Sequence, residues 1–489
     1  MMFDKIRTLI YDASIYGASS VLGQVINFCL LPVFTIYLTP KDFGILSMTS
    51  IVISLFVPIA NLGMSNAIFR RFNLCKDEKE KWAVFDTGLL SVLIGAGIFC
   101  VLCLFFIDPI TNLFVKELSY SEIFVITVLT AALTTIAQVP AVVLRALRRV
   151  KLIALINIVS VLLTSGISIW LVVWKQYGVY GIVISNLAAN SILVTVYCFI
   201  FFRRHQKLQI DFTIWKYMFR YGVPIIPHRL QSIGLSQFSH YMIASMVSMD
   251  QAGIYGIAIR ITMPMTFIVG AIQNAWVPYK FQLHANETKP ETIFSSITTY
   301  YLICISYVWA LICLWGPEIV RMMTTANYHE ATYLIPVVAL IPLSQSIYFM
   351  LGTGVEITDN TKPIPLISLG GLIVTVISAF LLIRQTGSQG AAISTCFGWI
   401  TMAVIVFLLS QKRYKITFDW WCIGLNFFLV MVLLIVVIEM QTMGTIVRIA
   451  LNFLISLLFP VFQIIILLRS RNERARILRL FKTRKLSFL

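Results

Sequence analysis

Two arginines fall deep inside segments that the sequence predicts to cross a membrane. Arg229 lies about eleven residues into an apolar segment at 218–248, and Arg260 about eight residues into the next segment, 252–277. A charge near the middle of a bilayer costs several kcal/mol on insertion scales, so it normally faces a partner, a watery cavity or a substrate. Because a planar guanidinium group can bind two oxygens at once, the two arginines point to an anion such as a phosphate or diphosphate.

Polar side chains at helical spacing extend this predicted site. Along 218–248, Ser232, Ser236 and His240 follow Arg229 on one helix face. The alternative is that such groups hydrogen-bond between packed helices, with Arg260 reaching outward to the bilayer surface. The polar residues expected to line a central cavity, from the first, second, seventh and eighth segments, are Tyr16, Ser20, Gln24, Asn27, Ser50, Ser54, Asn61, Arg229, Ser232, Ser236, His240, Arg260, Gln273 and Asn274.

Acidic residues are missing from the deep parts of these segments. Asp42 and Asp250 fall in predicted outer turns, and Asp86, Glu356 and Glu439 lie near segment ends. Cation exporters need buried carboxylates, so a basic, hydroxyl-rich cavity favours an anionic substrate that carries sugar hydroxyls. The sequence holds no nucleophile, metal or nucleotide constellation, so we expect neither an enzyme nor a bound cofactor.

The elements that position these residues are predicted to be membrane-spanning helices. The chain has 489 residues, of which 59% are hydrophobic and 12% charged, and its mean hydropathy is +0.88. Segments of about 20 apolar residues recur along it, as an all-α membrane protein requires. The fourteen predicted spans are 9–38, 44–66, 83–107, 121–144, 152–174, 179–202, 218–248, 252–277, 293–316, 331–354, 364–383, 389–410, 420–440 and 448–468.

Lysine and arginine predict the orientation. One set of alternate loops, which includes both termini, holds 30 of these residues, and the other set holds six. Positive charge stays on the cytoplasmic side, so both termini and the loops at 70–82, 145–151, 203–217 and 411–419 are predicted to be cytoplasmic in a bacterial inner membrane. The net charge of +17 then reflects orientation and not a nucleic-acid partner. The basic tail at 469–485 is expected to lie on the anionic inner leaflet, with docking of a cytoplasmic synthase as the alternative.

An internal repeat divides the chain. Asp42 and Asp250 stand in similar turn sequences 208 residues apart, and Lys151 and Lys362 begin similar segments 211 apart. A duplicated unit of six helices enters from the same face in both copies, so a substrate site between the halves and rocking of one half against the other are expected. The predicted domains are 1–217, 218–415, and a helix pair with the basic tail at 416–489.

Three motifs resemble a known family. They run from Tyr37 to Ile45, from Asn61 through Arg70 and Arg71 to Phe72, and from Ala271 to Phe281. The sequence is similar to the polysaccharide-export flippases of the multidrug/oligosaccharidyl-lipid/polysaccharide superfamily, which include O-antigen and capsule repeat-unit flippases. The resemblance implies a fold of two six-helix lobes plus a helix pair, and a cationic cavity at Arg229 and Arg260. It also implies that Arg70 and Arg71 receive the entering diphosphate, although retention of positive charge inside explains them as well.

The hypothesis that follows is a flippase. The resemblance implies transport of an undecaprenyl-diphosphate-linked oligosaccharide from the cytoplasmic to the periplasmic leaflet by alternating access. The expected partners are this lipid-linked sugar, membrane lipids and the polysaccharide polymerase machinery; coupling to an ion gradient stays an open alternative. A multidrug or cation antiporter of the same superfamily is one rival. A membrane-integral polymerase or ligase is the other, although the longest outer loops, 108–120 and 317–330, are short for such an enzyme.

Overall fold

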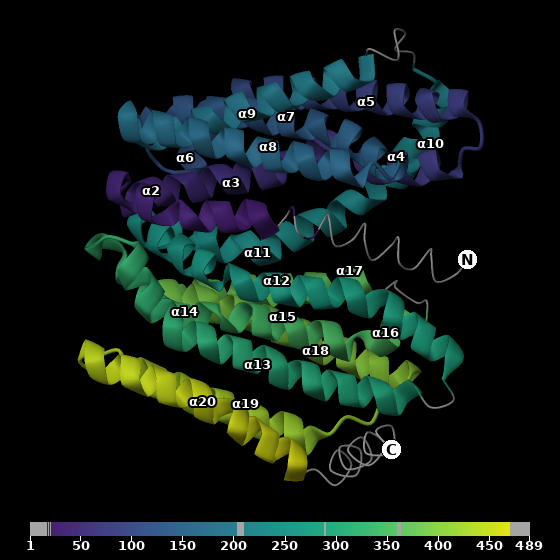
Figure 1. Cartoon of the computed structure of the whole chain (residues 1–489). Coiled ribbons are helices and arrows are strands. Elements are labelled where there is room, and N and C mark those ends of the chain that lie inside the picture. The colour runs from purple at the N-terminus through teal and green to yellow at the C-terminus, as the bar shows by residue number, and fades with distance from the viewer. Residues whose placement is uncertain are drawn as a thin grey trace, which may run out of the picture. The chain divides into compact units, whose positions relative to one another are not determined.

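The computed structural model describes residues 17, 19, 21–202, 210–287, 290–358 and 363–469. The described residues form helices joined by short turns, and none of them forms a strand (Figure 1). The all-α, multi-pass architecture expected from hydropathy is therefore confirmed. Twelve described helices are long and apolar enough to cross a membrane: 40–61, 78–105, 118–146, 150–174, 178–201, 249–285, 290–323, 326–351, 364–386, 388–413, 420–440 and 445–469.

The other two predicted spans, the first and the seventh, have a different form. The described part of the first is the shorter apolar helix Val21–Tyr37, with a turn at Leu30, and its residues Tyr16 and Ser20 lie outside the described residues. The seventh consists of α10 (Phe212–Gly222), the 3₁₀ turn η3 (Val223–Ile225) and α11 (Ile226–Met246). The predicted count of fourteen thus corresponds to twelve long apolar helices, one shorter helix and one broken polar helix.

The chain forms two compact units, and their boundary lies between Gly256 and Ile257, inside α12 (Met249–Asn286). The first unit also holds α2 (Leu31–Tyr37), α3 (Pro40–Asn61), α4 (Met64–Leu74), α5 (Glu78–Phe105), α6 (Ile107–Phe114), α7 (Ser121–Ala146), α8 (Val150–Ile169) and α9 (Gly178–Phe202). Because α11 packs on α3, residues 218–256 lie in this unit, whereas the repeat predicts a lobe boundary at 217. The lobe division by repeat stays a prediction.

The two turns from which the repeat is predicted are helix N-caps. At the start of α3, the Thr39 backbone N–H donates to Asp42 Oδ2 (2.8 Å), and the Asp42 N–H donates to Thr39 Oγ1 (3.3 Å). At the start of α12, Ser248 Oγ accepts from the Gln251 N–H (3.1 Å). Both arrangements satisfy backbone donors that a helix start leaves unpaired. The recurring Asp-containing pattern therefore marks where a span begins.

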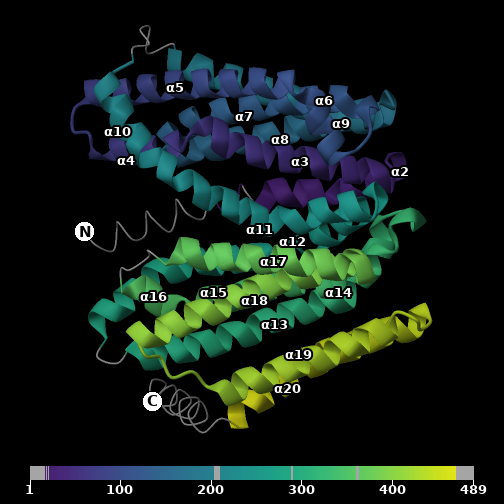
Figure 2. The ribbon, with the colours of Figure 1, turned by 180° about the vertical axis from the view of Figure 1, so that it is seen from behind.

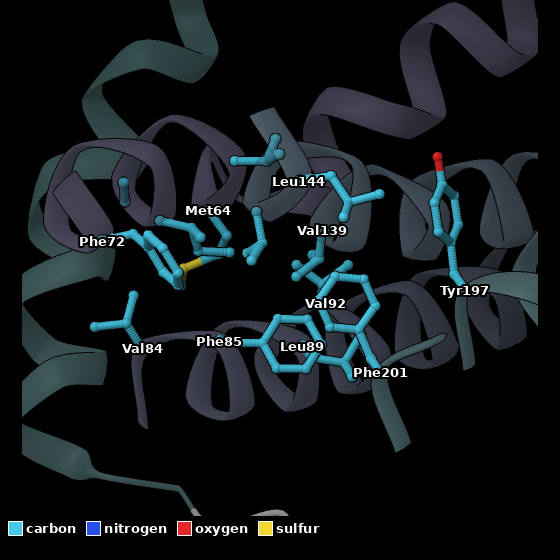
Figure 3. Close-up of a cluster of buried hydrophobic side chains, with 14 of the residues drawn as sticks. Met64, Phe72, Val84, Phe85, Leu89, Val92, Val139, Leu144, Tyr197 and Phe201 are labelled. Carbon is cyan, nitrogen blue, oxygen red and sulfur yellow. The ribbon is translucent and has the colours of Figure 1, made fainter. Parts of the chain in front are cut away.

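The core of the first unit lies between α4, α5, α7 and α9. Figure 3 shows Met64 and Phe72 of α4 facing Phe85 and Leu89 of α5. The rings of Phe85 and Phe201 stack with centroids 4.7 Å apart. This packing extends α4 to Leu74, so the predicted loop at 70–82 is in fact helical except between Cys75 and Asp77. The reason is that Ile68 and Phe72 continue an apolar face beyond the predicted end of the span.

The second unit holds the remainder of α12 and the helices that follow it (Figures 1 and 2). A buried polar network attaches the last helix pair to α13, because Asn426 Nδ2 donates to Ser306 Oγ (3.0 Å) and Gln463 Nε2 donates to Asn426 Oδ1 (3.0 Å). Arg448 also forms a buried ion pair with Glu318. The elements are α13 (Pro290–Met323), η4 (Ala326–Tyr328), α14 (Ala331–Val338), α15 (Leu340–Leu351), α16 (Thr353–Ile357), α17 (Ile364–Thr386), α18 (Ser388–Arg413), α19 (Trp420–Met440) and α20 (Thr445–Arg469).

Candidate functional site

The polar stripe predicted on the seventh span is present on α11. Arg229, Ser232 and Ser236 are all exposed along one side of the helix, while Leu235 is buried on the other. Arg229 forms no salt bridge with any described residue. Ser236 Oγ donates to the Ile233 carbonyl (3.1 Å), so its lone pairs remain available. Within the first unit, this face of α11 therefore presents one cation and two hydroxyls that are not buried.

His240, one further step along the stripe, is used in packing. Its side chain is 6% exposed, and Nε2–H donates to the Ala252 carbonyl oxygen (2.8 Å). The imidazole also meets the Tyr255 ring edge-on, with centroids 5.2 Å apart. The first turns of α12 cover this end of α11, so His240 joins the two helices. This is the interhelical role that the sequence left as the alternative.

Arg260 and Asn274 lie on α12 in the second unit. The Arg260 side chain is half-buried and interacts electrostatically with Tyr328, a fully buried residue of η4. Asn274 is exposed, whereas the buried Gln273 Nε2 has no hydrogen-bond partner among the described residues. Arg260 and Asn274 are fourteen positions apart, which places them near the same face of a helix. Each arginine of the predicted pair thus belongs to a different compact unit.

Gln24 and Asn27 lie in the first described helix, at residues 21–29. Gln24 is half-buried and Asn27 is exposed. A methyl group on Gly23 would lie 3.1 Å from Val161, so this helix packs against α8 at Gly23. Asn27 is open to a ligand, and Gln24 is partly covered.

Arg70 and Arg71 on α4 both contact aromatic rings of α10. The Arg70 guanidinium lies over Tyr221 (4.7 Å to the ring centroid), and that of Arg71 over Tyr217 (5.3 Å). Arg71 also forms an ion pair with Glu80 of α5, and its buried Nε has no hydrogen-bond partner among the described residues. Arg70 is exposed, so a ligand can reach it, but both side chains already have structural partners.

The structure adds a buried charge pair that the sequence reasoning missed. Lys280 is 1% exposed and forms an ion pair with Glu356 of α16. One turn earlier, Trp276 Nε1–H donates to Thr353 Oγ1 (3.4 Å). Lys280 lies beyond the predicted end of the eighth span at 277, whereas α12 runs to Asn286. One feature of the sequence could have indicated Lys280. It follows Arg71 by 209 residues, close to the offsets of 208 and 211 from which the repeat is predicted.

A second polar contact lies near this pair in the same unit. The Tyr414 hydroxyl donates to Glu291 Oε1 (2.7 Å), and the His284 ring meets the Tyr414 ring edge-on. Burial, together with the Glu291 carboxylate, raises the pKa of Tyr414, so the phenol stays protonated and remains a donor. Among the described residues, no group of three His, Cys, Asp or Glu side chains could hold a metal ion.

The sequence matches a known protein family and a known membrane protein. The family described as polysaccharide biosynthesis protein matches residues 34–333, more than half of the chain. An uncharacterized membrane protein of Haemophilus influenzae is 22% identical over 281 residues, which are 56% of this chain and 66% of that protein, just under two thirds.

Solved structures share the fold. An inward closed conformation of the lipid II flippase MurJ matches with a TM-score of 0.69 and 15% identity, over 93% of this chain and 98% of that one. An inward-facing multidrug resistance transporter of the MATE family matches with a TM-score of 0.65 and 16% identity, over 80% of this chain and 94% of that one. A transporter of the MOP superfamily from Pyrococcus furiosus matches with a TM-score of 0.59 and 15% identity, over 82% of this chain and 95% of that one. At 15–16% identity, these matches show a shared fold.

Proposed function

This chain belongs to the polysaccharide biosynthesis protein family, and from that premise we propose that it is a flippase for a lipid-linked oligosaccharide. Its substrate is an undecaprenyl-diphosphate-linked repeat unit of O-antigen, capsule or exopolysaccharide. The headgroup passes from the cytoplasmic to the periplasmic leaflet by alternating access, while the polyprenyl chain stays in lipid. The flippase MurJ shares the fold, which makes a lipid-linked substrate compatible with this architecture.

The observation that carries this proposal is the open face of α11. Arg229 is a guanidinium group exposed on a helix of the bundle without an acidic partner among the described residues, and Ser232 and Ser236 follow it on the same side. A cation held this way needs a counter-charge from outside the protein, and a diphosphate supplies it. The serine hydroxyls then bind oxygens of the phosphate or of the first sugar. Arg260, on α12, is the second cation in the proposal.

The proposal includes a location. The chain lies in a bacterial inner membrane with both termini in the cytoplasm, as the excess of Lys and Arg in one set of loops supports. In that orientation Arg70 and Arg71 lie on the side from which the substrate enters. The polysaccharide polymerase machinery, on the opposite side, is the proposed acceptor of the flipped substrate.

A direct assay tests the activity. The purified protein is reconstituted in liposomes that contain a fluorescent undecaprenyl-diphosphate oligosaccharide, and a membrane-impermeant quencher reports headgroups in the outer leaflet. The proposal expects that headgroups in the inner leaflet become quenchable at a rate that scales with protein. Equal quenching in protein-free liposomes and proteoliposomes would contradict it.

A multidrug or cation antiporter is the second candidate, because a MATE-family multidrug transporter shares the fold. It requires a carboxylate that binds the cation. The buried Asp86 is the ninth residue of the 28-residue helix α5 and does not lie on the open face of α11. Efflux of cationic dyes from the same proteoliposomes distinguishes the two: the antiporter predicts dye efflux without headgroup transfer, and the flippase predicts the reverse.

A further inference from the structure

The helix α10 crosses the ends of α4 and α5 within the first unit and leads directly into α11 (Figures 1 and 2). It begins after Asp211, whose Oδ1 accepts from the Thr213 N–H (2.8 Å) and the Ile214 N–H (3.1 Å). Ile214, Met218 and Gly222 form its buried face. This short helix is therefore an amphipathic connector, seated on the bundle by three residues of one face.

Two adjacent arginines hold the edge of α10. Arg70 and Arg71 are neighbours on α4, and their partners Tyr221 and Tyr217 are four residues apart, one turn, on α10. Residues at this spacing lie on the same side of a helix. Because Arg71 also pairs with Glu80, the contacts tie α10 to both α4 and α5. We call these four residues, Arg70, Arg71, Tyr217 and Tyr221, the arginine–tyrosine clamp.

At the end of the clamp, two helix breaks touch backbone to backbone. The span that starts with α3 breaks at Leu62 (φ 52°) and Gly63 (φ 69°), both in the left-handed region. The span that starts with α10 breaks after Gly222. A methyl group on Gly63 would lie 2.2 Å from the Gly222 carbonyl oxygen, and one on Gly222 would lie 2.7 Å from the Leu62 carbonyl oxygen. Only residues without a Cβ allow this approach.

The break at Leu62 and Gly63, between α3 and α4, is also held by contacts of Asn61. Asn61 Oδ1 accepts from the Ser65 N–H (3.0 Å), which caps the start of α4, and Asn61 Nδ2 donates to Gln138 Oε1 of α7 (3.3 Å). The turn at Gly63 is thus fixed to the bundle. By contrast, the break after Gly222 is followed by Pro224 in η3 and Pro227 at the start of α11, which remove backbone donors and permit a bend.

We propose that Tyr217 and Tyr221 are positioning residues for transport, and that with Arg70 and Arg71 they seat α10 so that Gly222 rests on the Gly63 turn and serves as the fixed pivot of α11. The inference rests on the proposed function, because α11 carries Arg229. In this proposal Arg70 and Arg71 position α11, the helix that carries Arg229, and do not contact the entering diphosphate directly. The clamp then keeps the base of α11 still while the rest of that helix tilts.

The first test needs no substrate. Amide hydrogen exchange of residues 213–222 is measured in the purified full-length protein in nanodiscs. Tyr221→Leu and Arg70→Gln should each speed exchange in α10 about two- to fivefold, the scale of one exposed cation–π contact. Tyr221→Phe, which keeps the ring, should restore protection, and the exposed Phe212→Leu on the other edge of α10 is the matched control. Exchange that is equal in all variants would overturn the clamp, even if the protein were not a flippase.

The second test is a double-mutant cycle on transport of the lipid-linked oligosaccharide. Tyr221→Leu and Arg70→Gln should each slow transport, and the double variant should be no slower than the worse single variant, because both remove one contact. Tyr217→Leu with Arg71→Gln forms a second cycle. If the tyrosine variants transport at the wild-type rate while the arginine variants fail, the arginines act on the substrate directly and the positioning role is refuted. Multiplicative losses would refute it as well.

Discussion

Gly44 and Gly253 lie backbone against backbone, although 209 residues separate them in the chain. A methyl group on Gly44 would lie 2.1 Å from the Met249 carbonyl oxygen, and one on Gly253 would lie 1.9 Å from the Pro40 carbonyl oxygen. Both glycines stand one turn after the N-caps that begin α3 and α12. Two glycines from the similar turn sequences are therefore in direct backbone contact.

Gly253→Ala is expected to destabilise the protein. The new methyl group meets a carbonyl oxygen at a distance that requires the backbones to separate, and overpacking of this kind costs about 1–3 kcal/mol. Thermal unfolding in detergent, followed by the fluorescence of buried tryptophans, should show a lower melting temperature. Gly97→Ala is the matched control, because it lies in the helix α5 and the added methyl group would meet no atom within 4 Å apart from the nearby backbone of α5 and the neighbouring residues. That control should be neutral or slightly stabilising.

Glu356→Gln is expected to cost more stability than Lys280→Met. The Lys280 side chain is almost fully buried, whereas the Glu356 side chain is 33% exposed. Loss of the carboxylate therefore leaves the more deeply buried charge, the Lys280 ammonium group, without its partner. Breaking a buried pair on one side costs roughly 3–5 kcal/mol. The double variant Lys280→Met/Glu356→Leu should recover most of the loss, because no buried charge remains. Additive losses, measured by chemical unfolding, would show that the two groups do not form a pair.

Asn426→Leu is expected to loosen the last helix pair. It removes the hydrogen bonds of Asn426 with Ser306 and Gln463, each worth about 0.5–1.5 kcal/mol, while Gln463 Nε2 keeps the Ile303 carbonyl and Ser306 Oγ as acceptors. Hydrogen exchange in α19 and α20 should increase, with less change in α17 and α18. The control is Phe428→Leu on the exposed side of α19. An equal change of exchange in α17, α18, α19 and α20 would contradict the role of Asn426 in holding the last helix pair.

The Cys75 thiol should react slowly at neutral pH. It lies in the loop between α4 and α5, and burial, aided by the Glu80 carboxylate, raises its pKa. A raised pKa leaves less thiolate at any pH below it, so maleimide labelling should keep accelerating above the pH at which an ordinary thiol levels off. Labelling is followed by mass spectrometry of the native protein. Urea-unfolded protein should level off at a lower pH, and the same profile in both states would contradict the burial of this thiol.

The hydropathy of the sequence predicted the membrane helices because uncharged segments of about 20 residues have one main interpretation. The spacing of Arg229, Ser232 and Ser236 predicted the polar face of α11, because residues three and four positions apart lie on one side of a helix. His240 follows the same spacing yet is buried, because the start of α12 covers that end of α11, and a pattern within one helix does not show what its neighbour covers.

The contacts between helices could not be predicted in the same way. Charge usually marks the end of a span, so the sequence predicts that the eighth span ends before Lys280. The ion pair with Glu356 explains why the lysine is tolerated in α12. The approach of Gly63 to Gly222 has no hydropathy signal, because it depends on two backbones that are distant in the chain. The break in the seventh span was indicated only by Pro224 and Pro227, which are also common in unbroken membrane helices.

The most direct test of the central claim is transport by variants of the two deep arginines. Headgroup transfer of a fluorescent undecaprenyl-diphosphate oligosaccharide is measured in proteoliposomes for Arg229→Gln, Arg260→Gln and the matching lysine variants, with the exposed Arg384→Gln as control. Loss of a charge-assisted contact with the diphosphate should slow transport about tenfold or more in each glutamine variant, with partial recovery in the lysine variants and no change in the control. Wild-type transport rates in both glutamine variants would contradict the account.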